Sequence, residues 1–399
     1  MDPSDIGVRI REIRQRRRLT LRATAELAGR SHAWLSLIER GMRSLDRRSD
    51  IDALAAALRV SPTELLQQPY PPVDQGDAEA QEQMEAMRVA LVSLDLTDPA
   101  EVEWRQPLDH TVLSAQAARA ALYRRGEVTA TGHALPHLLT TLHAHATNGA
   151  EDEQRKALEA LVETCCTAVS LTKMLGYHDL AWIGAERGRQ AAHRLGDAIW
   201  VGLADFYMSY ALRPYSLGAA NSVRALAAMD PAAGGGPRAM QVYGMLQMMA
   251  AFGAAVTGRD DDMRTHLAEA DELAARTGDT SDLELYFGPS NVAIWRLTMA
   301  VERGEGGRGL EAARDVHLDV VSRRRRAAYL LDLGRAQAQE RHDREAVASL
   351  LQAEQLMPQE LHSNPFARQI IADLYRRARA SVGRPDLRGL AARVGVDVS

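Results

Sequence analysis

Residues 20–41 contain two short segments with the signals of helix starts, and the second presents side chains that could make specific contacts. Thr20 and Ser31 are each placed to act as an N-cap, whose side-chain oxygen accepts a hydrogen bond from a backbone N–H group. Leu35 and Ile38 have the spacing of the buried side of the second helix. The residues left on its outer side are His32, Ala33, Ser36 and Leu37. A helix that presents its first turns in this way fits the major groove of double-stranded DNA, where side chains meet base edges.

The chain after this helix carries arginines that could contact phosphates. Arg43, Arg47 and Arg48 follow Gly41 and would continue along the DNA backbone, where contacts fix the register of a protein without reading sequence. Residues 1–70 contain 13 arginines and 9 acidic residues, a net charge of +4, whereas the remainder has 35 basic and 44 acidic residues, a net charge of −9. A basic N-terminal region on an acidic remainder suits the binding of a polyanion at one end of the molecule.

Further helix signals surround these two segments. Ile6, Ile10 and Ile13 have the spacing of one buried helix face ahead of Thr20. The apolar stripe of a fourth helix consists of Ile51, Leu54, Ala55 and Leu58. The start of a fifth helix is marked by a capping box with proline at its first position, formed by Ser61, Pro62 and Glu64. The sequence therefore predicts a domain of five short helices over residues 1–68.

Five helices in this order resemble the lambda-repressor-like, or XRE-type, helix-turn-helix family over about residues 6–68. The motifs that carry the resemblance are Ile10-Arg11-Glu12-Ile13-Arg14, Leu19-Thr20, Ala28-Gly29, Leu35-Ser36-x-Ile38-Glu39-Arg40-Gly41 and Val60-Ser61-Pro62-x-Glu64-Leu65-Leu66. The resemblance implies an ion pair between Arg14 and Glu39, which would connect the first helix to the end of the recognition helix. It also implies base contacts from His32, Ala33 and Leu37, and a phosphate contact from Leu21.

Several of these positions depart from the polar residues that are usual in the family. Only His32 could hydrogen-bond a base, whereas Ala33 and Leu37 could touch a thymine methyl group. Trp34 has two interpretations, because it could pack on the adjoining loop or on the C-terminal repeat region, or it could contact DNA. The full set of candidate DNA-contacting residues is Leu21, Ser31, His32, Ala33, Trp34, Ser36, Leu37, Arg40, Arg43, Arg47 and Arg48. The alternative is a degenerate helix-turn-helix that is kept for protein contacts.

The composition of the whole chain favours helices. Only 5% of the residues are aromatic, and no long alternation of β-branched residues indicates a sheet, so we expect an all-α protein. We find no uninterrupted apolar run of 18 residues and no signal-peptide pattern, and therefore expect a cytoplasmic protein without a membrane segment. Cys165 and Cys166 are adjacent and poorly placed for a disulfide, which favours two buried thiols.

The chain beyond the N-terminal domain divides at a proline-rich segment. Residues 69–77 are predicted to be an extended linker, and 79–94 a long amphipathic helix. Residues 78–380 are predicted to form a tetratricopeptide-like α-solenoid, and 381–399 a C-terminal tail. The recurring sets behind this prediction are Ala181, Ala185, Gly188, Ala192; Ser222, Leu226, Met229; Met263, Leu267, Ala270, Ala274; and Ala346, Leu350, Ala353, Met357. Small residues at such spacing let paired helices stack closely.

Few residues in this second region could carry catalysis. His133 and His137 have the i, i+4 spacing of a zinc site, but no cysteine or acid completes a set, so we expect no metal. No phosphate-binding glycine loop and no nucleophile motif is present, and we expect neither a cofactor nor an enzyme. The arginine run 323–326 is predicted to be a solvated helix face, or else a contact with the acidic region of a partner subunit.

The segment 286–296, YFGPSNVAIWR, is the most unusual of this region. Gly288 and Pro289 should break a helix, after which Ser290 can cap a new one that carries Asn291 and Trp295 on one face. An amide and an indole could hold a ligand, although Asn291 could instead satisfy the helix break internally. The segment resembles a Phe-Gly-Pro-Thr-Asn segment of XRE regulators with helical repeat domains from high-GC bacteria. The candidate ligand-binding residues are Tyr207, Tyr210, Tyr243, Asn291 and Trp295.

These patterns together predict a DNA-binding transcription regulator. Two recognition helices about 34 Å apart in a homodimer would read a near-palindromic site. The similarity to regulators that join such a domain to tetratricopeptide repeats implies that the repeat channel senses a signalling peptide or, second, a small molecule. The alternative is a protein-interaction scaffold with a vestigial or docking helix-turn-helix.

Overall fold

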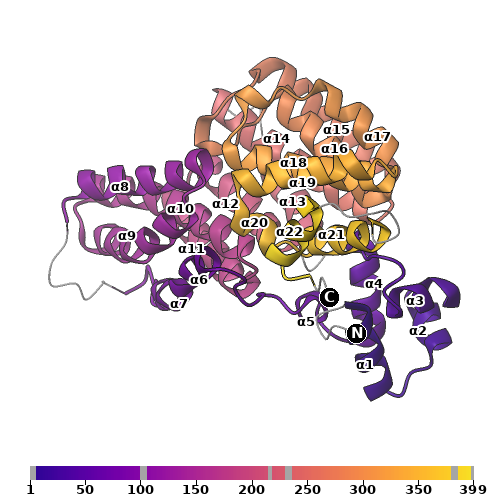
Figure 1. Cartoon of the computed structure of the whole chain (residues 1–399). Coiled ribbons are helices and arrows are strands. Elements are labelled where there is room, and N and C mark those ends of the chain that lie inside the picture. Colours follow the sequence, from indigo (N-terminus) through magenta and orange to yellow (C-terminus); the bar gives the residue numbers. More distant parts are fainter. Residues whose placement is uncertain (1–5, 99–105, 214–217, 230–235, 379–384, 397–399) are drawn as a thin grey trace.

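A computed structural model describes residues 6–98, 106–213, 218–229, 236–378 and 385–396 (Figure 1). Throughout these ranges the regular structure is helical and contains no β-strand, which confirms the all-α class expected from the sequence. We call residues 6–68 the head and residues 75–396 the body. In Figure 1 the head projects from one end of the body, with α4 next to the body and α2 and α3 beyond it.

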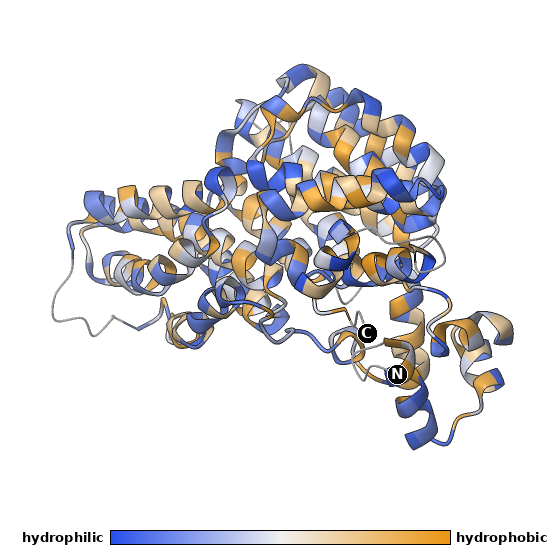
Figure 2. Cartoon of the chain, viewed as in Figure 1, coloured by the Kyte–Doolittle hydropathy of each residue, from blue (hydrophilic) through white to orange (hydrophobic). Residues whose placement is uncertain are grey.

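The head consists of five short helices around one apolar core. They are α1 (Ile6–Arg16), α2 (Leu21–Leu27), α3 (His32–Glu39), α4 (Arg48–Leu58) and α5 (Pro62–Leu66). The predicted caps are present: the side chains of Thr20, Ser31 and Ser61 each accept a backbone hydrogen bond at the start of α2, α3 and α5. The C-terminal end of α1 and the turn after it are strongly hydrophilic (Figure 2), because this segment carries exposed arginines at 16, 17 and 18.

The segment between head and body is not a free spacer, which corrects the expected extended linker at 69–77. The ring of Tyr70 is half-buried and its centroid lies 3.8 Å from the guanidinium carbon of Arg368, and the Tyr70 carbonyl accepts a hydrogen bond from Gln81 at 3.1 Å. The long helix expected at 79–94 is also wrong, because the chain forms α6 (Gln75–Glu82) and α7 (Met84–Val92) with a break at Gln83.

The body is built from helices that pack against their neighbours in sequence. Its first part comprises α8 (Leu108–Ala120), a π-helical turn (Ala121–Arg125), α9 (Val128–Asn148), α10 (Glu151–Met174), α11 (His178–Leu195), α12 (Ala198–Ala211) and α13 (Gly218–Ala228). Its second part comprises α14 (Gly236–Val256), α15 (Asp260–Thr277), α16 (Pro289–Arg303), α17 (Gly306–Ala312), α18 (Arg323–Gln339), α19 (Asp343–Leu356), α20 (Pro358–His362), α21 (Pro365–Ala378) and α22 (Pro385–Arg393). Short 3-10 turns occur at Asp282–Glu284, Ala313–Asp315 and Leu318–Val320.

Neighbouring helices of the body pack closely at glycines that lie in the recurring sets of small residues or near them. A Cβ atom added at Gly188 of α11 would lie 3.1 Å from the Cβ atom of Cys165 in α10. Likewise, a Cβ atom added at Gly334 of α18 would lie 3.0 Å from the Cγ atom of Leu350 in α19. Both cysteines are free and buried, as predicted. The pairs α10 with α11 and α18 with α19 are therefore held at short range.

Two further expectations about the body need correction or qualification. Part of the expected tail is the helix α22, whose Leu387 and Leu390 are buried in the second core of the body, while 381–384 and 397–399 lie outside the described residues. By length and composition alone, α14 among the described helices could cross a membrane, but 78% of its most apolar window is buried inside the protein.

Candidate nucleic-acid interface and central cavity

The outer face of α3 is available at the surface of the head. His32 and Ala33 in its first turn are exposed, and Ser36 and Leu37 are half-buried. The opposite face is fully enclosed, because Leu35 and Ile38 are only 0% and 1% exposed. Ser31 accepts a hydrogen bond from the backbone nitrogen of Trp34 at 3.1 Å, which fixes the start of this helix. The helix therefore presents the predicted side chains outwards on a rigid support.

An ion pair connects α3 to α1. Glu39, at the C-terminal end of α3, is 3% exposed and receives two hydrogen bonds from Arg14, at 2.6 Å and 2.8 Å. Arg11 adds a bond of 2.7 Å from its Nη2 atom to the Glu39 carbonyl oxygen. This bidentate geometry holds the orientation of α3 relative to α1, because both side chains lose freedom together.

Trp34 is the first correction to the expected DNA contacts. Its side chain is 8% exposed and belongs to the apolar core of the head, with the Arg30 guanidinium carbon 5.5 Å from the ring centroid. The tryptophan thus packs within the head, on neither the DNA side nor the body. Leu21, expected at a phosphate, is half-buried at the first position of α2.

The arginines after α3 also separate into different roles. Arg40 and Arg43 are exposed. Arg47 is engaged by Asp50, with hydrogen bonds of 2.9 Å and 3.1 Å. Arg48 is a correction: its guanidinium pairs with Glu302 of α16, and its backbone nitrogen donates to the same carboxylate at 2.8 Å. Arg48 therefore faces the body, and Arg43 is the loop arginine best placed for a phosphate.

The comparison with known protein families bears on this region alone. Residues 5–67 match the model of a helix-turn-helix domain. The head is therefore a helix-turn-helix domain, a class of domain that binds DNA. The match spans α1 to α5 and ends at the segment that leads to the body. No curated protein and no solved structure matches the chain.

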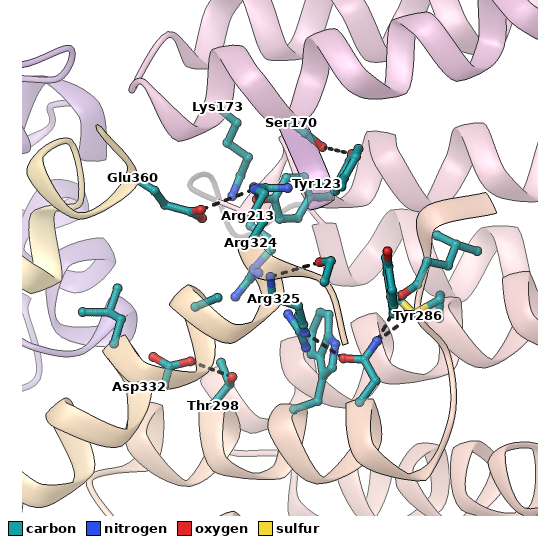
Figure 3. Close-up of a pocket in the computed structure, with 18 of the residues that line it drawn as sticks. Tyr123, Ser170, Lys173, Arg213, Tyr286, Thr298, Arg324, Arg325, Asp332 and Glu360 are labelled. Atoms are coloured by element: carbon teal, nitrogen blue, oxygen red, sulfur yellow. Dashed lines mark hydrogen bonds and ion pairs between the residues drawn. The ribbon is translucent and has the colours of Figure 1, made fainter. Parts of the chain in front are cut away.

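A cavity of about 200 Å³ lies inside the body, where α10, α12, α16 and α18 meet the head. We call it the central cavity (Figure 3). Four of the five residues expected at a ligand line it, namely Tyr207, Tyr210, Asn291 and Trp295. Tyr243 does not line it, since this half-buried residue packs against the main core of the body. The tyrosines come from one helix, α12, and the other two residues from α16.

The segment before α16 differs in detail from its prediction. Ser290 is not the cap, because α16 begins at Pro289, and the carboxylate of Asp279 accepts the Ser290 N–H and O–H bonds at 3.1 Å and 2.9 Å. The Asn291 amide donates to the Leu285 carbonyl at 3.2 Å and accepts from Arg325 at 2.7 Å. Asn291 is thus satisfied by the protein and positions Arg325 at the cavity.

Sequence reasoning missed the charged residues of the central cavity. The run 323–326 is neither a solvated face nor an exposed contact surface, because Arg324 and Arg325 point into the cavity beside Lys173 and Arg213 (Figure 3). A signal was available in the sequence. Arg324 lies three and seven residues before Ala327 and Leu331, which places it on the apolar face of α18.

A smaller cavity of about 110 Å³ lies beside the central cavity, next to the head. The two share Arg48, Lys173, Tyr210, Arg213, Glu360, Asn364 and Phe366 as lining residues. The smaller one is also lined by Ile51 of α4 and Leu66 of α5. Phe366 of α21 belongs to the apolar core of the head, with the Arg48 guanidinium carbon 4.5 Å from its ring centroid. Head and body therefore both contribute to the walls of these two neighbouring cavities.

The histidines considered as metal ligands do not converge on one site. His133 and His137 are exposed, whereas the nearby His143 and His145, which follow in the same helix, are buried with their Nε2 atoms 2.7 Å from the carbonyl oxygens of Asp95 and Gln106. Within the described ranges, the group spaced for a metal is Asp74, Asp77 and His362. There the imidazole already bonds Asp77 at 3.1 Å and Glu354 at 3.1 Å, so the group is an internal ion-pair cluster.

Proposed function

We propose that the protein is a cytoplasmic transcription regulator that binds specific double-stranded DNA through α3 and senses a ligand in the central cavity. On this proposal the head is of the XRE type, the body is a tetratricopeptide-like repeat domain, and two copies form a homodimer. His32 and Ala33 contact base edges, and Arg40 and Arg43 contact phosphates.

One observation carries the sensing part of the proposal. Arg48 is the first residue of α4 in the head, and its side chain also lines the central cavity. A ligand that fills the cavity must therefore contact or displace a residue of the DNA-binding domain. Coupling between the cavity and the head then needs no long pathway, because Arg48 belongs to a helix of the head and also lines the cavity.

The size of the cavity favours a small molecule over the signalling peptide that family resemblance puts first. Its volume of about 200 Å³ is little larger than the roughly 150 Å³ cavity that holds a benzene molecule. A peptide of several residues would need the walls to separate. We therefore place a small molecule first and a short peptide second.

The test is a selection of genomic DNA fragments bound by the full-length protein, followed by affinity measurements on the enriched fragments. We expect a few fragments to be enriched, and His32→Ala to broaden the preferred sequence while Arg43→Ala weakens binding to all fragments. Binding that is equal for all fragments would contradict regulation by sequence and favour the interaction scaffold. An unchanged preference in His32→Ala would contradict the assigned reading face.

A further inference from the structure

We propose that the central cavity is an anion site, which binds a small organic molecule with a carboxylate or phosphate group attached to a flat ring. This inference rests on the proposed sensing function and names its class of ligand. It is carried by the charges that surround the cavity, by unsatisfied hydrogen-bond donors in its wall, and by its aromatic lining.

The first argument is a count of charges. Six cationic side chains line the cavity: Arg48, Lys173, Arg213, Arg324, Arg325 and Arg335. Each lining carboxylate already has a guanidinium partner: Glu284 pairs with Arg124, Asp332 with Arg335, and Glu360 with Arg324, at 2.6 Å, 2.8 Å and 3.4 Å. Buried Glu302, behind the wall, pairs with Arg48 and Arg335. Within the described ranges, Lys173, Arg213 and Arg325 are left without a carboxylate partner.

The second argument is that donors of these groups are buried without acceptors. The Nε atom of Arg213 and the Nη2 atom of Arg325 have no hydrogen-bond partner among the described residues. The indole Nε1 atom of Trp295 is in the same condition. Burying a donor without an acceptor costs about 1–3 kcal/mol, and more for a charged group. All three residues line the central cavity, so a ligand bound there is a source of the missing acceptors once the side chains adjust to it.

Aromatic rings partly compensate the unpaired cations but do not neutralise them. The Lys173 Nζ atom lies 3.8 Å from the ring centroid of Tyr210. The guanidinium carbon of Arg213 lies 4.0 Å from the ring centroid of Phe252 and 5.4 Å from that of Trp295. These contacts hold the cations in place, while the positive charge remains available to a ligand.

The pKa values of Lys173, Arg213 and Arg325 agree with the lack of carboxylate partners around them. Burial, together with neighbouring arginines, lowers the pKa of Lys173 well below its ordinary value. Burial lowers the pKa of Arg213 to about 9 and that of Arg325 to about 10. The charged groups that face Lys173 are Arg48 of α4, Arg213 after α12, Arg324 of α18 and Glu360 of α20, and the titratable neighbours include His178 and Tyr210. A bound anion would offset the repulsion and raise the pKa of Lys173.

The remaining wall defines the rest of the ligand. Aromatic rings from several elements surround the cations: Tyr123, Phe206, Tyr207, Tyr210, Tyr286, Trp295 and Phe366. A flat apolar group can stack among such rings. Because the volume suits about one ring, the ligand class is a single-ring or similarly sized carboxylate or phosphate.

The experiment uses the full-length protein with benzoate and phenyl phosphate as probes, and benzamide as the uncharged control. Isothermal titration should show binding of at least one anion and at least about tenfold weaker binding of benzamide. Tighter binding of phenyl phosphate would identify a phosphate ligand, and tighter binding of benzoate a carboxylate ligand. Arg213→Gln and Arg325→Gln should each lower the affinity for the anion about tenfold or more, since each variant loses a charged hydrogen bond.

Two controls separate a ligand site from a structural role. Arg323→Gln alters the adjacent arginine, which bonds the carbonyls of Leu356 and Gln355 outside the cavity, and should leave probe binding unchanged. Lys173→Met removes an uncompensated buried cation, so it should raise the Tm of the free protein while abolishing stabilisation by the anion. If both anions bind no better than benzamide, or if Lys173→Met lowers the Tm, the inference is wrong.

Failure of the inference can be distinguished from failure of the proposed function. Enrichment of specific DNA fragments by a protein that ignores both anions would overturn the anion site and leave DNA binding intact. Anion binding by a protein that prefers no DNA sequence would support the anion site and overturn the proposed regulation through specific DNA.

Discussion

The contact between Arg48 and Glu302 offers the sharpest test of how head and body are connected. We consider Glu302→Gln, which keeps the shape of the side chain and removes its charge. Glu302 is 2% exposed, and its carboxylate accepts hydrogen bonds from the Arg48 backbone at 2.8 Å and from Arg335 at 2.9 Å. Burial opposes its charge, but Arg48 and Arg335 outweigh that effect and hold the pKa of Glu302 below its usual value.

The substitution should be strongly destabilising, because it leaves two guanidinium groups without their common counter-charge. Removal of one member of a buried ion pair costs about 3–5 kcal/mol. If this cost falls entirely on the contact between head and body, it corresponds to a change of roughly 10² to 5 × 10³ in the equilibrium between packed and separated head. The first turn of α4 should be affected most, since the N–H group of Arg48 loses a charged acceptor.

Hydrogen exchange measured by mass spectrometry, together with urea unfolding, provides the assay. In Glu302→Gln, peptides that cover residues 46–52 should exchange about 10²-fold faster or more than in the wild type. The matched control is Glu305→Gln, which alters a partly exposed ion pair with Arg303 two residues after the same helix and should cost less than about 1 kcal/mol. Equal exchange and equal stability in the two variants would refute the assignment of Arg48 to the body.

Two further predictions concern the stability of the body. An added Cβ atom at Gly244 would lie 2.1 Å from a phenylalanine ring, whereas at Gly132 the nearest atom is 3.7 Å away. In thermal unfolding, Gly244→Ala should therefore cost about 1–3 kcal/mol or more, and Gly132→Ala should be neutral or stabilising; equal effects would contradict this packing. Burial opposes protonation of His362, but hydrogen bonds with Asp77 and Glu354 raise its pKa to about 9. The charged imidazole should contribute about 3 kcal/mol to the free energy of unfolding below pH 6.5, and this contribution should be lost as the pH rises through 9. If urea unfolding at a series of pH values gives His362→Gln the same pH dependence of stability as the wild type, this role of His362 is contradicted.

Local signals were sufficient to predict the helix-turn-helix domain. The caps at Thr20, Ser31 and Ser61 and the apolar spacing of Leu35 and Ile38 act within a few residues, so the sequence displays them directly. The same rules identified the break before α16. They could not identify Asp279, which lies eleven positions before Ser290 and accepts the hydrogen bond of its backbone N–H group.

The roles of individual arginines could not be predicted in this way. Arg43 and Arg48 lie in one basic segment, and sequence alone treats them alike. Arg48 turns to the body because Glu302, 254 positions later in the chain, supplies a buried carboxylate. The sequence mispredicts Arg324 for a different reason. A run of four arginines is typical of a solvated helix face, and this composition hides the helical spacing that places Arg324 on the apolar side of α18. Tertiary packing therefore decided the composition of the central cavity.

The claim on which the account depends is that the outward face of α3 and the arginines beside it bind DNA. The most direct measurement is the affinity for a selected fragment at several salt concentrations, for the wild type and for Arg43→Ala. Binding through phosphates should make log K fall linearly with log salt, and Arg43→Ala should reduce the slope by about 0.9 for each head bound. A slope near zero in the wild type, or an unchanged slope in the variant, would contradict this mode of binding.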